Sequence, residues 1–216
     1  PGSSIERVYE EAEADYAQVI ATADSVAEQA TKALVLANDA LTVFNDLSWE
    51  RTGLVSLPEG FSGAAAVDGT PLPVQRVGDK LLTEVTAPSC GWTTVLPAQP
   101  MAAADTLKVS EQLLENAYLR LTLNERGEIT SLIDKTSDLG ELAAGLCNSF
   151  QMFKDVPSRF DAWDIDSMYE KTPVPLDEPA KVEVIAAGPL VATLRITRKL
   201  SNSTLEQEIS LRRDSR

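Results

Sequence analysis

Three carboxylates and an indole lie within six positions in the second half of the chain, at Asp161, Trp163, Asp164 and Asp166. Carboxylates accept hydrogen bonds from sugar hydroxyls, and the face of a Trp ring offers a flat apolar platform for the C–H face of a pyranose. This segment therefore predicts a carbohydrate contact. Asp161, Trp163 and Asp164 are the candidate residues for one wall of a sugar pocket.

Three other interpretations of the segment stay open. Trp163 can instead fill a hydrophobic core with the acids solvated around it. The acids can also indicate a calcium loop, although the segment has no Gly at the turn and no bidentate Glu at its far end. The loop can finally be a seam between domains. Pro157 breaks any helix or central strand just upstream, so we expect a loop at the surface.

The residues needed for catalysis are missing from the sequence. There is no histidine, which removes the commonest general base and the commonest zinc ligand. Asp161 and Asp164 suggest the carboxylate pair of a retaining glycosidase, which lies about 5 Å apart with one pKa raised. In a surface loop, however, nothing nearby in sequence would desolvate one of the two selectively. We therefore predict no catalytic residue and no metal ligand in this chain.

Composition excludes several classes of partner. The chain has 33 acidic and 19 basic residues, and its net charge of −14 would repel nucleic acid and anionic membrane surfaces. We see no run of 18 apolar residues and no signal peptide, so we expect neither a membrane span nor a membrane partner. Cys90 and Cys147 are too few to staple a chain of this size. They predict two reduced, packed thiols in a cytoplasmic protein.

One long helix must position whatever follows it. Residues 5–34 contain no Gly or Pro, and their apolar side chains recur in steps of three and four. Such a helix would be ~45 Å long, too long for a small sheet to cover its apolar stripe. We therefore expect helical partners from a missing upstream segment or from a second copy of the chain in a homo-oligomer.

After Ala40 the apolar period changes to two, which predicts strands at 41–47, 53–57, 72–77, 80–85 and 92–96. Asp68-Gly69 and Gly78-Asp79 predict hairpin turns, and the run 98–105 predicts a linker. A second β unit follows, with a hairpin at 119–133, one or two helical turns at 139–146, and strands at 182–186, 191–200 and 205–211.

The predicted fold class is therefore mostly β: antiparallel β-sandwich domains preceded by one long N-terminal α-helix. We expect the long helix to end a helical bundle at 1–37, a small β domain at 38–100, and the first part of a large β-sandwich at 101–216.

Four stretches resemble the part of a glycoside hydrolase family 38 α-mannosidase that follows its catalytic domain. They are residues 43–51 (VFNDLSWER), 114–119 (LENAYL), 127–135 (GEITSLIDK), and 153–157 (FKDVP) running into 161–165 (DAWDI). Their order and spacing across residues 40–170 carry the resemblance. One departure is Asp46, where the family more often has Pro, and it puts only the local turn in doubt.

The resemblance implies that this chain is a non-catalytic fragment of a retaining α-mannosidase that acts on mannosides or oligosaccharides. Zinc and the catalytic carboxylates would belong to an upstream catalytic domain, and the fragment alone would be inactive. The resemblance also implies structural roles for Asn45, at a turn, and for Trp49, buried between helix and sandwich. Two alternatives from other classes are a freestanding carbohydrate-binding module and a structural or oligomerisation module.

Overall fold

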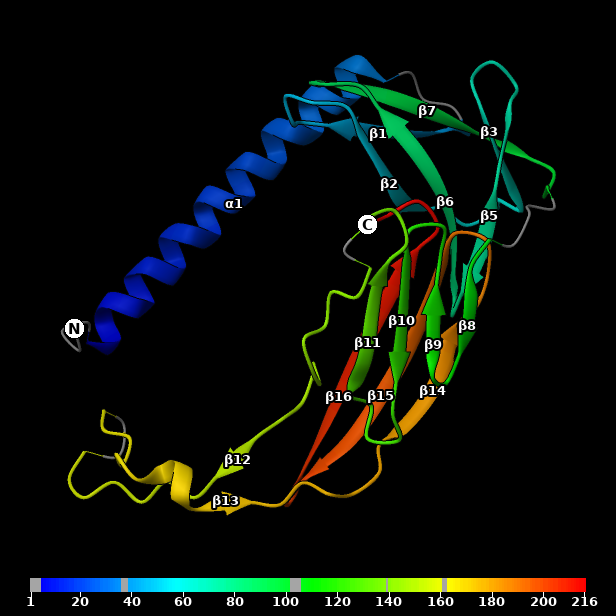
Figure 1. Ribbon diagram of the computed structural model, residues 1–216. Helices are drawn as coiled ribbons and strands as arrows, with labels where there is room; N and C mark the ends of the chain where they lie inside the picture. The colour runs from blue at the N-terminus through cyan, green and yellow to red at the C-terminus, as the bar shows by residue number, and fades with distance from the viewer. Residues whose placement is uncertain (1–4, 36–38, 102–105, 139, 161–162) are drawn as a thin grey trace.

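The computed structural model describes residues 5–35, 39–101, 106–138, 140–160 and 163–216. Figure 1 shows one N-terminal helix followed by antiparallel sheets, five of them among the described residues. The predicted fold class, mostly β with one long helix in front, is confirmed.

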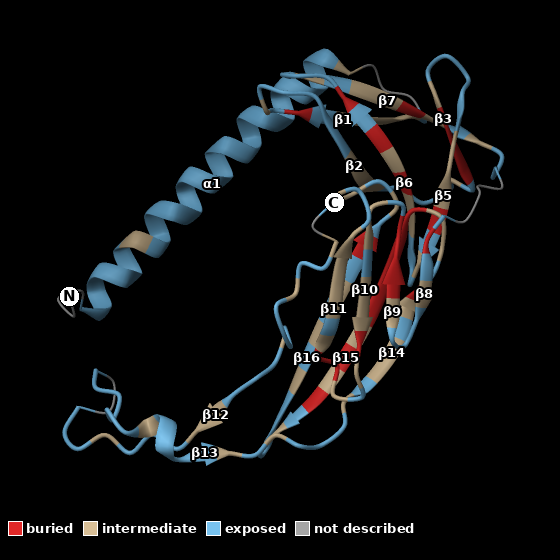
Figure 2. Ribbon diagram, in the orientation of Figure 1, coloured by how far each residue is buried: buried red, intermediate tan, exposed pale blue. Residues whose placement is uncertain are grey.

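Helix α1 (Glu6–Leu34) follows from the uninterrupted three-and-four spacing of its apolar residues. None of its residues is buried, and Tyr16, Val19 and Ile20 are 67%, 65% and 60% exposed. Figure 2 shows the helix projecting away from the sheets. The apolar stripe is thus not covered by this chain's own strands, as its length predicts. No helix within the described ranges is both long enough and apolar enough to span a bilayer.

The first β unit packs two sheets face to face. One has the order β1-β7-β3-β4 and the other the order β2-β6-β5. Their bounds are β1 (Leu41–Asn45), β7 (Gly91–Ala98), β3 (Gly63–Ala66), β4 (Pro71–Leu72), β2 (Arg51–Ser56), β6 (Lys80–Ala87) and β5 (Val74–Val77). Leu57, Ala64, Val85 and Val95 form the buried core between the sheets.

Both predicted hairpin turns of this unit are present. Gly69 and Gly78 adopt positive φ angles of 85° and 59°, and Val77 pairs with Lys80 across the second turn. Strand β3 was not predicted because its sequence, Gly-Ala-Ala-Ala, has no β-branched or aromatic residue. Its small side chains let β3 lie close to β7: a Cβ at Gly63 would stand 2.5 Å from the backbone of Gln99.

The second β unit is also a pair of facing sheets. One has the order β11-β10-β9-β8 and the other the order β14-β15-β16. Their bounds are β11 (Ile129–Asp134), β10 (Leu119–Leu123), β9 (Leu113–Glu115), β8 (Lys108–Ser110), β14 (Lys181–Ala186), β15 (Val191–Leu200) and β16 (Ser203–Arg212). Leu114 and Leu123 from the first sheet meet Leu194 and Ile196 from the second in one buried core.

The helical turns expected at 139–146 are absent from the part that is described, residues 140–146. Glu141 explains why. It forms an isolated antiparallel bridge with Ile133, and its carboxylate accepts the backbone N–H groups of Leu132 at 2.8 Å and Ala143 at 3.1 Å. These bonds hold the segment against β11 in an extended course, which outweighs its weak local preference for helix.

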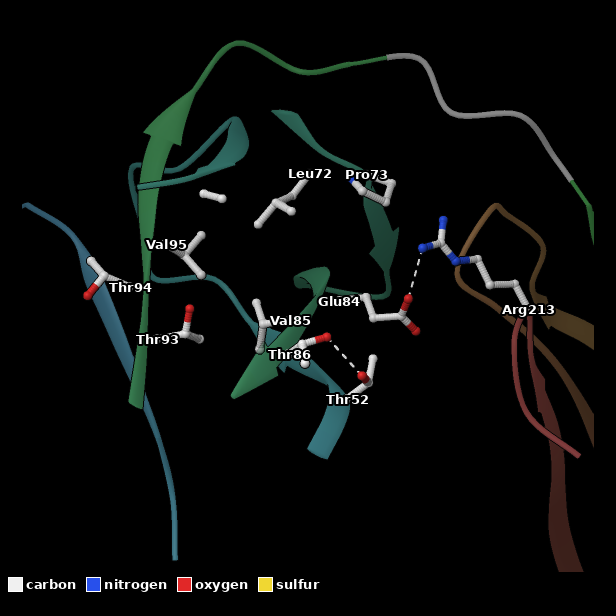
Figure 3. A pocket seen from close by; sticks show the side chains of 11 residues that line it. Thr52, Leu72, Pro73, Glu84, Val85, Thr86, Thr93, Thr94, Val95 and Arg213 are labelled. Atoms are coloured by element: carbon white, nitrogen blue, oxygen red, sulfur yellow. Dashed lines mark hydrogen bonds and ion pairs between the residues drawn. The ribbon is translucent and has the colours of Figure 1, made fainter. Parts of the chain in front are cut away.

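The two β units meet along a polar seam. Arg213, just after β16, reaches Glu84 of β6 with a 2.8 Å ion pair, and Gln75 of β5 is buried against the turn between β14 and β15. Figure 3 shows Arg213 and Glu84 pointing toward each other at the rim of a cavity of about 320 Å³ inside the first unit. Thr52 and Thr86, two exposed residues that also line this cavity, are hydrogen-bonded to each other at 2.8 Å.

The structure tests three further expectations from the sequence. Asn45 is buried, and its side-chain amide donates to the carbonyls of Trp49 at 2.8 Å and Pro88 at 2.9 Å, so its structural role at the turn is confirmed. The expectation that Trp49 is buried is wrong, because this residue is 60% exposed among the residues that the structure describes. Cys90 and Cys147 are free thiols, as expected, but both are exposed rather than packed.

Candidate functional site

The site is built on the turn between β10 and β11. The Asn124 side chain forms the turn, since its Oδ1 accepts the backbone N–H groups of Arg126 at 2.9 Å and Glu128 at 3.0 Å. Gly127 has a φ of 70°, and a Cβ there would lie 2.5 Å from Cγ2 of Ile196 in the core. Only glycine therefore lets the turn lie this close to β15.

Glu128 is a buried carboxylate at the end of this turn. It accepts hydrogen bonds from Asn124 Nδ2 at 2.7 Å, Ser149 Oγ at 2.7 Å and Arg126 Nε at 3.0 Å. These bonds, from Asn124 and Ser149 above all, lower the pKa of Glu128 because they favour its charged form. The ionised carboxylate thus joins the turn to the segment that begins at Ser149.

Arg198 of β15 is a buried cation held mainly by carbonyl groups. Its guanidinium donates to the carbonyls of Arg126 at 3.0 Å, Asn148 at 3.2 Å and Gly127, and to Oε1 of Gln207 at 3.0 Å. The same group stacks 4.8 Å above the ring of Phe150. Burial lowers the pKa of Arg198, and the nearby charge of Glu128 opposes that effect.

Residues 149–160 and 163–177, which we call the arm, extend from this point. Figure 1 shows the arm running from the end of the second sandwich away from its core. Strands β12 (Met152–Phe153) and β13 (Pro173–Val174) pair antiparallel along it. The short 3-10 helix η1 (Tyr169–Lys171) comes just before β13, on the side away from the sandwich. Phe153 and Tyr169 make an edge-to-face contact with ring centroids 5.2 Å apart. The arm is therefore an ordered ribbon with its own small aromatic contact.

Both ends of the arm are tied to the same turn. On the outgoing side, Asn148 donates to the Gly127 carbonyl at 3.1 Å and receives a hydrogen bond from Gln207 at 3.0 Å. On the returning side, the backbone N–H of Ala180 donates to the Glu125 carbonyl at 2.9 Å. Between the two sides lies an open cavity of about 360 Å³, lined in part by Glu128, Phe150 and Phe153.

The acidic and aromatic loop lies at the far end of the arm. Trp163 is 75% exposed, and Asp164 is exposed beside it. The backbone N–H groups of both residues donate to the Phe160 carbonyl, at 2.8 and 2.7 Å. The interpretation of Trp163 as a core residue is wrong for this chain. Asp161 lies outside the described residues.

Two carboxylates order this loop. Asp155 Oδ1 accepts the backbone N–H of Asp166 at 3.0 Å, and Asp166 Oδ1 accepts that of Met168 at 3.0 Å. Five large apolar side chains of this segment are exposed: Val156, Phe160, Trp163, Ile165 and Met168. Folded domains rarely expose many large apolar side chains within a short segment unless that segment binds something.

The described residues offer no donor set for a metal. The sequence has no histidine, and the described residues include no group of three or more Cys, Asp or Glu side chains that would hold an ion. The residues described here therefore do not fit zinc, and no chemical step of this chain is assigned to it.

Sequence reasoning missed the residues that hold the arm. Arg198, Gln207 and Asn148 lie in a strand, a strand and a loop, and each has a type that is common on exposed surfaces. The one usable signal was Gly127, which opens the stretch 127–135 that carries part of the family resemblance. It marks a turn at which backbones approach closely.

This chain is similar in sequence to one protein family and to two named proteins. Residues 114–216 match the family described as glycosyl hydrolases family 38 C-terminal domain. The human and mouse proteins named alpha-mannosidase 2C1 are each 29% identical over 224 residues, which cover 97% of this chain and 20% of theirs. The chain thus spans about a fifth of the length of these relatives.

Two solved structures share the fold. A glycosyl hydrolase family 38 protein from Enterococcus faecalis matches with a TM-score of 0.66 and 13% identity, over 99% of this chain and 35% of its own. An α-mannosidase from Enterococcus faecalis matches with a TM-score of 0.58 and 14% identity, over 91% of this chain and 28% of its own. Residues 114–216 of this chain are thus similar to the C-terminal domain of glycosyl hydrolases family 38.

Proposed function

We propose that this chain is the non-catalytic C-terminal portion of a retaining, zinc-dependent α-mannosidase that acts on α-mannosides in oligosaccharide breakdown. The observation that carries this proposal is an alignment: 97% of the chain aligns with 20% of the length of a protein named alpha-mannosidase 2C1. The absence of histidine supports placing the zinc ligands of the parent outside this chain. The fragment by itself is expected to be inactive.

The proposal includes a division of the chain into the end of a helical bundle at 1–37, a small β domain at 38–100 and the first part of a large sandwich at 101–216. Two separate cores support it. The core residues of the first unit run from Leu57 to Val95, and those of the second from Leu107 to Leu211. The exposed stripe of α1 supports a partner for that helix, for which we propose the missing part of the parent, including its catalytic domain.

Within the parent, we propose that Asp161, Trp163 and Asp164 form a wall of the sugar pocket. The exposed indole at the end of an ordered arm supports this role, because an aromatic face needs access to stack on a pyranose. The alternative is a seam with the catalytic domain, which the exposed apolar side chains of the arm also support. The carboxylate of Asp161 suits the pocket better, whereas the large apolar area of Trp163 suits the seam.

Paired measurements on the longer enzyme separate these roles. If Asp161 and Trp163 line the pocket, Asp161→Ala and Trp163→Ala each lower kcat/KM by roughly ten- to hundred-fold, equivalent to about 1–3 kcal/mol. If they lie in a seam, thermal stability falls while the kinetic constants of the folded enzyme stay near normal. Normal kinetics together with normal stability in the Asp161→Ala enzyme would reject both roles.

The activity of the chain itself tests the proposal directly. We expect no hydrolysis of an aryl α-mannoside and no stoichiometric zinc in the purified chain. Hydrolysis that survives purification and is lost in Asp164→Ala would contradict the proposal.

A freestanding carbohydrate-binding module is the second candidate, and the exposure of Trp163 is the observation that favours it. It predicts that the isolated chain binds methyl α-mannoside in calorimetric titration and that Trp163→Ala abolishes binding. The main proposal predicts no measurable binding, because only one wall of the pocket would be present.

We further propose a cytoplasmic location for the parent. Two exposed free thiols support it, since reducing compartments keep such groups unpaired.

A further inference from the structure

We propose that Arg198 is a positioning residue that fixes the direction in which the arm leaves the second sandwich. Its consequence for catalysis rests on the proposed function, because there the arm carries the wall of a sugar pocket. Its consequence for the geometry of the arm rests on this chain alone.

The acceptors of Arg198 come from two segments that must be held together. The carbonyls of Arg126 and Gly127 belong to the β10–β11 turn, and the carbonyl of Asn148 belongs to the start of the arm. A guanidinium is planar, and its donors point in fixed directions, so all of these bonds are satisfied in one relative placement of turn and arm. A buried cation is costly to leave without acceptors, which penalises every other placement.

Asn148 and Phe150, at the start of the arm, set the direction in which its backbone continues. Asn148 has a φ of 55°, an unusual backbone angle for a residue other than glycine, and its side chain is held by Gly127 and Gln207. Two residues later, the ring of Phe150 lies under the guanidinium at 4.8 Å. The backbone is therefore bent at Asn148 and held again at Phe150, which sets the course of β12.

Apolar packing does not replace the hydrogen bonds of Arg198 in holding the arm against the turn. Beyond Phe150, the open cavity of about 360 Å³ lies between the arm and the turn, so few apolar contacts hold the two together there. The returning side is tied by the Ala180 to Glu125 backbone bond and by an ion pair of 3.8 Å between Arg126 and Asp177, whose side chain is mostly exposed. An exposed ion pair contributes little, so the direction of the arm depends mainly on its outgoing side, where Arg198 and its acceptors act together with the 2.7 Å hydrogen bond from Ser149 to Glu128.

Distance measurements in the chain itself test the geometry. Spin labels are placed at Lys171→Cys on the arm and Glu111→Cys on the sandwich, both exposed, in a background of Cys90→Ser and Cys147→Ser. We expect double electron–electron resonance to give one narrow distance distribution. In Arg198→Met the width at least doubles, and in Arg198→Lys it is intermediate, because an ammonium reaches only some of the acceptors.

Arg195→Met is the matched control. Arg195 lies on the same strand, has a side chain that is 42% exposed, and pairs with Glu208 at 2.8 Å rather than with the arm. The control distribution should match that of the parent chain. If folded Arg198→Met also matches the parent, the proposal is overturned. If Arg198→Met does not fold, Gln207→Leu replaces it, since it removes the amide that joins Arg198 to Asn148: broadening supports the proposal and an unchanged width overturns it.

Kinetics of the longer enzyme separate this proposal from the proposed function. If both hold, Arg198→Met lowers kcat/KM for an aryl α-mannoside by roughly ten-fold or more, partly rescued by Arg198→Lys, while Arg195→Met has no effect. A broadened distribution with unchanged kinetics supports the positioning role and contradicts the pocket wall. Lowered kinetics with an unchanged distribution overturns the positioning role.

Discussion

Gln75 and Val191 are joined by two hydrogen bonds although 116 positions separate them in the chain. Nε2 of Gln75 donates to the Val191 carbonyl at 2.7 Å, and the Val191 N–H donates to Oε1 at 2.8 Å. The Leu190 N–H donates to the same oxygen at 2.9 Å. One side chain of the first β unit thus satisfies three backbone groups of the second, in a place where water does not reach.

We expect Gln75→Ala to lower the free energy of unfolding by about 3 kcal/mol, because it leaves buried backbone groups at Leu190 and Val191 without partners. Urea unfolding followed by tryptophan fluorescence and by far-UV circular dichroism measures this change. The exposed residue Gln99 provides the control, since Gln99→Ala should change stability by less than about 0.5 kcal/mol. Equal effects of the two substitutions would contradict a role for Gln75 in the seam.

Gly127→Ala and Gly140→Ala form a second pair. Both glycines have positive φ angles, of 70° and 64°, so alanine strains the backbone at each by about 1 kcal/mol. At Gly127 alone the added Cβ meets Ile196 at 2.5 Å, whereas it meets nothing within 4 Å at Gly140. We expect a total loss of about 2–4 kcal/mol at Gly127 and about 1 kcal/mol at Gly140 in chemical unfolding. Equal losses would show that the close approach of the turn to β15 is unimportant.

Glu115 predicts a specific dependence of stability on pH. It is buried and accepts Arg120 at 2.9 Å and Lys135 at 3.0 Å. The hydrogen bond from Arg120, then the contribution of Lys135, lowers its pKa from 4.5 to about 2. Because the folded pKa is the lower one, the stabilisation is complete above pH 4.5 and is lost as the pH falls toward 2.

We therefore expect Glu115→Gln to destabilise the chain by on the order of 2 kcal/mol at pH 7 and by progressively less below pH 4.5. Urea midpoints of both proteins between pH 7 and pH 3 measure the convergence. The exposed residue Glu59 provides the control, as Glu59→Gln should leave the midpoint unchanged across this range. A difference between parent and Glu115→Gln that grows on acidification would contradict the assignment.

The stripe of α1 gives the last prediction. Val19 is 65% exposed, so we expect Val19→Lys to change the free energy of unfolding of the isolated chain by less than about 0.5 kcal/mol. Sedimentation analysis over a range of concentrations accompanies the unfolding measurement. A dimer that Val19→Lys dissociates would assign the stripe to a second copy of the chain instead of the missing part of the parent.

Much of the fold could be read from the sequence because its signals are local. The three-and-four spacing of apolar residues specified α1, and the alternation around Leu121 with Gly at the turn specified the β10–β11 hairpin. Asp68-Gly69 and Gly78-Asp79 marked turns because glycine adopts positive φ at little cost. Each of these features depends on residues only a few positions apart, so the sequence alone is enough to predict it.

The burial of individual side chains was decided only by the tertiary structure. Trp163 and Trp49 have the same apolar rings as core residues, but they are exposed because the strands nearby in space do not cover them. Residues 140–146 follow β11 because Glu141 binds the backbone of Leu132 across it. Arg198 and Gln75, polar residues in strands, are buried because acceptors and donors 50 to 116 positions away meet them. The partners that satisfy a buried polar group come from distant parts of the chain, and only the folded arrangement brings them together.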